Sequence, residues 1–163
     1  ALALNALTVL SGLPVLRASD LDWGFEMWED IVADAEVPYT AFVWHALVSF
    51  SRSMSASVKL LDRIAHACGR LVDRDGTMGG MLQALRVFGS VASNSATGFA
   101  TIRFLVERVE QLSERCSTAC GSMGRDALVT VTRRLARDDK FAREGEARAA
   151  LATRSFTSAA LLW

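Results

Sequence analysis

Two histidines, His45 and His66, are the only imidazoles in this chain, so any histidine-based catalysis or haem ligation must use them. On one continuous helix their separation of 21 residues corresponds to about 31 Å, too far to share a metal. Only a hairpin between them, or a second chain, would bring them together. We therefore interpret both as packing or surface residues, with a haem-ligating pair as the alternative.

Carboxylates cluster in residues 26–36 and raise the question of a metal site; they are Glu26, Glu29, Asp30, Asp34 and Glu36. A di-metal site in a helical bundle uses a Glu-x-x-His pair on each of two helices, and the sequence contains no such pair. The run Asp73-Arg74-Asp75-Gly76 is similar to part of a calcium loop, but Ala84 stands where the final bidentate glutamate belongs. We interpret the acidic cluster as a solvated face or a docking surface for a basic neighbour.

Other catalytic signatures are missing as well. The glycines form neither a phosphate loop nor a dinucleotide fingerprint, and no serine lies in a nucleophile elbow. Three cysteines, Cys68, Cys116 and Cys120, are too few for a disulfide framework, and we expect small buried thiols. The sequence predicts no catalytic residue, no metal and no cofactor, and therefore a protein that is not an enzyme.

The elements that carry these residues are predicted to be helices throughout. No proline follows Pro38, and apolar residues recur at three- and four-residue spacing almost to Trp163. We predict an all-α fold, a bundle of five to seven helices, with one long helix around residues 38–74. Its weak point is Ser49–Ser57, where serine alternates with larger residues and a kink or short break fits the pattern. Turns are expected at Asp73–Gly76 and Ser93–Ser95. We also expect an amphipathic helix from Phe99 to Cys116, ended by Gly121–Gly124, and an alanine-rich segment over residues 142–162.

The chain divides into an apolar segment, residues 1–18, and a helical domain, residues 19–163. Residues 1–40 hold one basic and seven acidic residues, whereas the remainder holds 17 basic and 11 acidic residues. This asymmetry favours an acidic N-terminal arm packed on a basic body, its own or a neighbour's. We expect residues 1–18 to be an arm that docks on a partner. Nucleic acid is not expected, because basic residues are interleaved with acidic ones and no aromatic residues lie between them as stacking platforms.

Tryptophans are concentrated in one segment. Trp23, Trp28 and Trp44 are interface or lipid-facing candidates, with an aromatic-rich core corner as the alternative, and we expect Trp23 and Trp44 to be exposed. The chain is 51% hydrophobic without a run long enough to span a membrane. Such a composition indicates faces that are buried against partners or laid on a membrane.

Residues 58–114 resemble the N-terminal half of the peroxin-eleven family, whose members elongate peroxisomal membranes. The similar pieces are the helix from Leu60 to Leu71 and the segment from Ser93 to Leu112. The resemblance implies non-enzymatic membrane association through residues 96–115, with Arg103 and Arg108 at the lipid headgroups. Within this helix, Phe99, Ile102, Val106 and Val109 either pack in the core or face lipid.

Together these patterns predict a non-catalytic accessory or structural subunit of a larger assembly, whose partners are other protein subunits. We expect it to be associated with an organellar membrane, mitochondrial or peroxisomal. Two alternatives stay open: a membrane-remodelling protein similar to the peroxin-eleven family, and a soluble bundle that binds haem or an apolar ligand.

Overall fold

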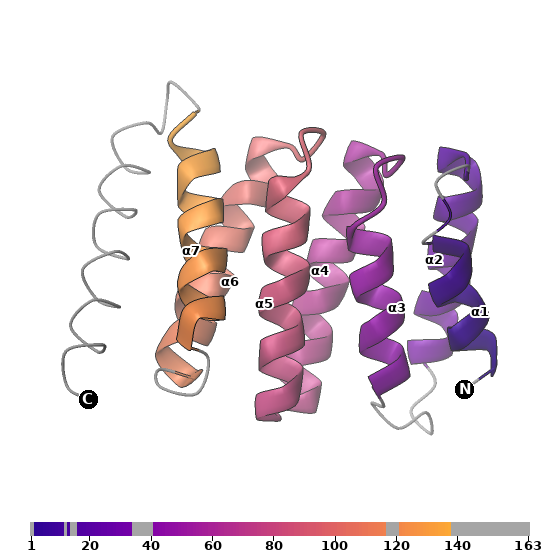
Figure 1. Cartoon of the computed structure of the whole chain (residues 1–163), viewed down its shortest axis with the longest axis horizontal. Helices are drawn as coiled ribbons and strands as arrows, with labels where there is room; N and C mark the ends of the chain where they lie inside the picture. Colours follow the sequence, from indigo (N-terminus) through magenta and orange to yellow (C-terminus); the bar gives the residue numbers. More distant parts are fainter. Residues whose placement is uncertain (1, 12, 14–15, 34–40, 117–120, 138–163) are drawn as a thin grey trace.

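The computed structural model describes residues 2–11, 13, 16–33, 41–116 and 121–137, and its regular structure there is entirely helical (Figure 1). The helices are α1 (Leu2–Ser11), α2 (Ala18–Ala33), α3 (Ala41–Ser51), α4 (Val58–Asp75), α5 (Met78–Ser93), α6 (Phe99–Cys116) and α7 (Gly121–Leu135). The prediction of an all-α fold with five to seven helices is confirmed. The predicted alanine-rich segment 142–162, Asp34, Glu36, Cys120 and Trp163 lie outside the described residues.

The helices lie in two layers. In Figure 1, α1, α3, α5 and α7 stand side by side in a front row, and α2, α4 and α6 lie behind them. Each front helix packs on the next front helix of the row, and the back helices pack against the front helices from behind. This arrangement of stacked helix pairs is that of α-solenoid repeats, in which each pair contacts only its neighbours.

The stack also repeats in the sequence. The back helices begin at residues 18, 58 and 99, so a helix pair recurs about every 40 residues. Each front helix carries an Ala-Leu pair and a further apolar residue three positions after the leucine: Ala6-Leu7-Leu10, Ala46-Leu47-Phe50, Ala84-Leu85-Phe88 and Ala127-Leu128-Val131. In α3, α5 and α7 every one of these side chains is at most 8% exposed. The same helical face therefore enters the core in each of these three repeats.

The predicted single helix across residues 38–74 is wrong, because the serine-rich stretch forms a hairpin. α3 ends at Ser51 and α4 begins at Val58. The Ser57 hydroxyl caps α4 by accepting a hydrogen bond from the Leu60 N–H at 3.1 Å. Serine side chains compete with the hydrogen bonds of the helical backbone and favour the N-cap position. The Ser49–Ser57 stretch therefore separates two helices, although its apolar spacing is also compatible with a continuous helix. The turn lets the apolar faces of both helices enter one core.

The other predicted boundaries agree with the structure, with one exception. α4 ends at Gly76, whose φ of 61° is the left-handed conformation that favours glycine, and α5 ends at Ser93. The exception is Gly121–Gly124, which we expected to end the preceding helix and which instead forms the first turn of α7.

The N-terminal segment is part of the stack. Leu4 and Leu7 of α1 are each 3% exposed and belong to the common core. The Ser49 hydroxyl donates a hydrogen bond to the Thr8 carbonyl at 3.0 Å, which ties α3 to α1. Residues 2–11 are therefore the first front helix, and a separate arm at 1–18 does not describe them.

Candidate functional site

The described residues hold no group of three or more His, Cys, Asp and Glu side chains that would bind a metal. The hairpin at the serine stretch does place the two histidine-bearing helices side by side, but the histidines face away from each other. His45 lines a pocket on the front face, while His66 lies on the back layer with its ring centroid 4.2 Å from that of Phe104. These two histidines cannot ligate one haem within a single chain.

The tryptophans fall into two groups. Trp28 is 1% exposed, stacks on Phe25 at 5.3 Å and donates its indole N–H to the Val43 carbonyl. Trp44 is 3% exposed and its indole N–H donates to an Asp75 carboxylate oxygen at 2.8 Å. The expectation that Trp44 is exposed is wrong, and Trp28 is equally unavailable to a partner. Both belong to the aromatic core corner that we gave as the alternative.

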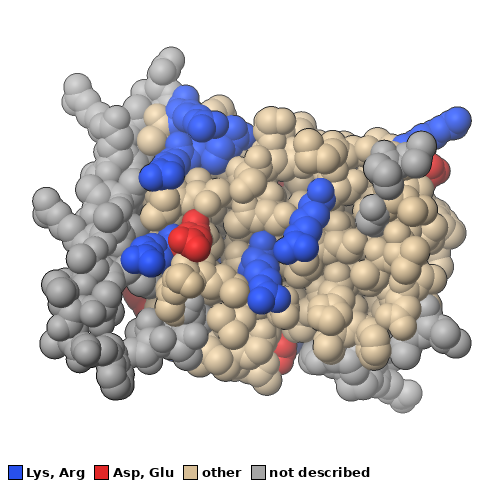
Figure 2. Space-filling model, in the orientation of Figure 1, with Lys and Arg blue, Asp and Glu red and all other residues tan. Residues whose placement is uncertain are grey.

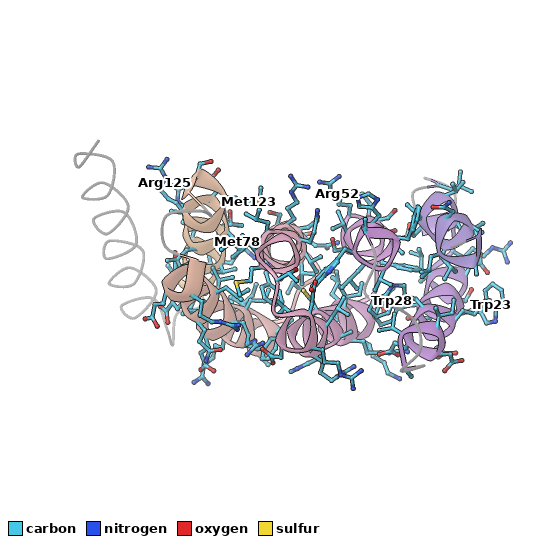
Figure 3. All side chains as sticks on the ribbon, turned by 90° about the horizontal axis from the view of Figure 1, so that it is seen from below. Trp23, Trp28, Arg52, Met78, Met123 and Arg125 are labelled. Carbon is cyan, nitrogen blue, oxygen red and sulfur yellow. The ribbon has the colours of Figure 1, made fainter. Side chains whose placement is uncertain are left out.

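Trp23 is the exposed tryptophan among these three, as expected. Its side chain is 59% exposed, and Figure 3 shows it pointing away from the other helices at the end of the array. In the same view Trp28 points inward between the two layers.

The apolar stripe of α6 faces the core. Ile102, Val106 and Val109 are 0% exposed, so these side chains are not available to lipid, whereas Phe99 is 41% exposed. Burial of this stripe against α7 and α5 accounts for the strong helical pattern that we read in the sequence.

The two α6 arginines differ in their surroundings. Arg103 lies on the exposed surface of the back layer. Arg108 is directed instead at α4, where its guanidinium donates to the Gly69 carbonyl at 3.1 Å and to the Asp73 carboxylate at 2.7 Å. The expected position of Arg108 at lipid headgroups is wrong, because this side chain forms a contact between neighbouring back helices.

That contact belongs to a set of equivalent positions. Arg63 of α4 pairs with Glu29 of α2 at 2.6 Å and lies over the Phe25 ring at 5.2 Å. Phe104 of α6 packs on His66 and faces Gly69 of α4, where an added Cβ would lie 3.2 Å from the ring. Aligning α2, α4 and α6 by their starts puts Trp23 level with Arg63 and Phe104, and Met27 level with Arg108. Side chains at these positions contact the preceding back helix.

Front helices also contact the preceding helix pair. Phe50 of α3 meets Phe25 of the back helix α2 in a T-shaped contact at 5.5 Å. Ala127 of α7 lies against Gly89 of the preceding front helix, 3.8 Å from a Cβ built there. By register, Ala6 and Leu10 of α1 are the residues that would face a preceding helix pair.

These positions are exposed at the start of the array. We call this surface the N-terminal end face; it consists of Ala6, Val9, Leu10, Trp23 and Met27. Val9 is 66% exposed and Leu10 41%, whereas the equivalents of Leu10 in the inner repeats, Phe50, Phe88 and Val131, are at most 2% exposed. No described residue covers the end face, so it exposes apolar side chains at positions that the inner repeats bury.

Part of the acidic N-terminal region packs on basic residues of the same chain. Glu29 of α2 contacts both Arg63 and Arg70 of α4, and Glu26 contacts Arg63 at 3.6 Å. The acidic cluster is therefore partly used within the stack, and Glu26 and Glu29 do not form a free acidic face.

Acidic and basic residues are interleaved in the sequence, but the two layers of the structure contain them in different proportions. Among the described helices, the front row contains one acidic residue, Asp126, and four basic ones, Arg86, Arg125, Arg133 and Arg134. The back row contains eleven acidic and seven basic residues. Figure 2 shows the result, a front face with blue groups on a largely uncharged surface and little red.

The front face is also hollowed. In Figure 3 the helices at the two ends of the front row lie farther forward than those between them, which makes this face concave. A pocket of about 650 Å³ opens over α1, α3 and α5, and one of about 330 Å³ opens over α5 and α7. Arg52 and Arg86 line both pockets, so we treat the two as one depression, the front trough.

Comparison of the chain with protein-family models, with curated proteins and with solved structures finds no match. Among the described helices none combines the length and the apolar character that crossing a membrane requires.

Sequence reasoning identified Trp23 but missed the rest of the end face and the front trough. The signal for the end face was present in the four Ala-Leu pairs at about 40-residue spacing. The trough had no local signal, because its residues come from four helices and two loops that only the stacking brings together.

Proposed function

We propose that this protein is a non-catalytic accessory subunit, held in a larger assembly by protein contacts on its N-terminal end face. The observation that carries the proposal is the exposure of Leu10 and Trp23 at positions where the inner repeats bury their side chains. An apolar patch of this kind on a folded domain marks an interaction site.

The partner surface that fits is a pair of helices stacked in the same register. Inner repeats cover the equivalent positions with the preceding helix pair: Phe50 has an aromatic contact and Arg63 a charged contact with α2. The end face lacks such a charge and offers Trp23 instead. A partner therefore needs an apolar helical surface, and tryptophan at the centre of such an interface contributes about 2 kcal/mol or more.

The experiment uses tagged copies expressed in the protein's own cells without the unmodified copy. Leu10→Glu combined with Trp23→Glu places two charges on the end face. The matched control, Val58→Glu with Met78→Glu, places the same charges at residues that are 55% and 41% exposed elsewhere on the molecule. Circular dichroism verifies that both variants are folded.

We expect the end-face variant to leave the assembly on a native gel and the control to stay in it. Equal incorporation of the two would contradict the proposal. These substitutions test the idea better than removing residues 1–18, because such a truncation also removes Leu4 and Leu7 from the core.

Membrane attachment and an organellar location stay predictions. Ile102, Val106 and Val109 are buried, so a membrane contact would have to use other residues. Extraction of the tagged chain with salt, carbonate or detergent tests whether it follows a membrane through its partners.

A further inference from the structure

We propose that the front trough binds an extended acidic segment of a partner protein, at a site separate from the N-terminal end face. The two surfaces lie on different sides of the stack, because the trough runs across the front row whereas Trp23 points away from the end of the array (Figure 3).

The charge of the trough is the first argument. Arg52 and Arg86 lie at the junction of the two pockets and are both exposed. The larger pocket has no Asp or Glu in its lining, and the smaller one has Asp126 at its far side. Guanidinium groups bind carboxylates in bidentate geometry, so the centre of the trough favours an anion.

The remaining lining is rich in small hydroxyl groups. Thr8, Ser11, Ser53 and Ser55 line the larger pocket, and Ser90, Ser93 and Thr130 the smaller one. Most of these hydroxyls already donate their one proton to a backbone carbonyl of this chain, so they offer a bound peptide acceptors for its N–H groups; they are Thr8, Ser11, Ser90, Ser93 and Thr130. Leu13 and Met54, which are 46% and 91% exposed at the larger pocket, offer apolar contacts to side chains that alternate with acidic ones.

The shape of the trough fits an extended chain. Neighbouring helices in a packed layer lie about 10 Å apart, so four front helices span about 30 Å. An extended peptide covers about 3.3 Å per residue, and roughly nine residues would cross the row.

An acidic peptide fits better than a nucleic acid strand. The lining of both pockets contains no Phe, Tyr or Trp, and His45 is its single ring, so a run of bases would find no series of stacking platforms. The whole chain also has equal numbers of acidic and basic residues, whereas nucleic-acid-binding domains carry a large basic excess. Two central arginines match a few carboxylates more closely than a continuous phosphate backbone.

The test is a fluorescence polarisation titration of the purified chain. The probe is a labelled ten-residue peptide, half of it Asp and Glu with Leu and Ser between them; the comparison probes are the same peptide with Lys at the acidic positions and a ten-nucleotide oligouridylate. The trough variant is Arg52→Glu with Arg86→Glu. The matched control is Arg74→Glu with Arg115→Glu, both exposed on the back layer.

We expect the acidic peptide to bind at 50 mM salt and to lose about tenfold or more in affinity in the trough variant, with less than twofold change in the control. The Lys peptide should not bind. Equal loss in both variants, or no binding of the acidic peptide, would overturn the proposal. Tighter binding of oligouridylate, lost in the trough variant, would identify the trough as a nucleic acid site instead.

A second measurement uses the natural partner. A photoreactive benzoylphenylalanine replaces Gln83, which lines the trough, or Glu107, which is exposed on the back layer. We expect the first to cross-link to a segment with an excess of Asp and Glu, and Arg52→Glu with Arg86→Glu to abolish that cross-link. Cross-links to RNA or to a segment without acidic residues would contradict the proposal. Equal cross-linking from position 83 and from position 107 would contradict it as well.

Discussion

Truncating equivalent residues in an inner repeat and at the end of the array should have very different consequences. Phe50 is 2% exposed, meets the Phe25 ring at 5.5 Å and lies within 3.5 Å of the Cβ position at Gly24. Phe50→Ala leaves a cavity between two helix pairs, and such substitutions lower the free energy of unfolding by about 3–5 kcal/mol. Leu10 has the same register but is 41% exposed, so Leu10→Ala should cost below about 1 kcal/mol in the isolated chain.

Urea unfolding followed by circular dichroism measures both values. With a total stability of about 5–15 kcal/mol, Phe50→Ala should shift the midpoint strongly while Leu10→Ala stays near the unmodified chain. If Leu10→Ala lowered the free energy of unfolding as much as Phe50→Ala, Leu10 would have to be buried in the isolated chain. That result would refute the placement of Leu10 on an exposed end face. A small cost for Phe50→Ala would refute the packing between the first two helix pairs.

Three further predictions concern single sites. Gly80→Ala places a methyl group onto the Asp75 carboxylate and should lower the free energy of unfolding by about 1–2 kcal/mol. Gly79→Ala places its methyl group 3.9 Å from the Thr77 hydroxyl, an ordinary contact, and should leave the free energy of unfolding unchanged or raise it by below about 1 kcal/mol. Thermal unfolding measures both values. Arg108→Ala removes two hydrogen bonds to α4 and should cost about 1–3 kcal/mol in urea unfolding, and a cost below 0.5 kcal/mol would contradict the role of this contact. Burial raises the pKa of the Cys68 thiol above its ordinary value of 9.0, so the folded thiol keeps a proton that the unfolded chain releases. The free energy of unfolding should therefore fall as pH rises past 9.0, by about 1.4 kcal/mol per unit, and a Cys68→Ala variant should fall less steeply over the same range.

Much of the fold could be predicted because it depends on local patterns. The Asp73–Gly76 turn and the apolar spacing of α6 each follow from the chemistry of a few neighbouring residues. The hairpin at Ser49–Ser57 was missed because serine suits both a helical surface and an N-cap, and only the packing of α3 against α4 decides between them.

The candidate sites depend on relations between distant residues. We expected Trp44 to be exposed because the sequence does not reveal its hydrogen-bond partner, Asp75, which is 31 residues away. The end face becomes visible only when α1 is aligned with the inner helices, and the short Ala-Leu motif is too common to reveal that alignment by itself. The front trough needs the separation of charges between layers, which the alternation of front and back helices produces.

The measurement that tests the central claim most directly is the native mass of the tagged protein, extracted from its own cells in mild detergent. We predict a particle that contains several different proteins and that the end-face variant Leu10→Glu with Trp23→Glu fails to join. Migration of the unmodified chain as a single copy or a small homo-oligomer would contradict the account of an accessory subunit.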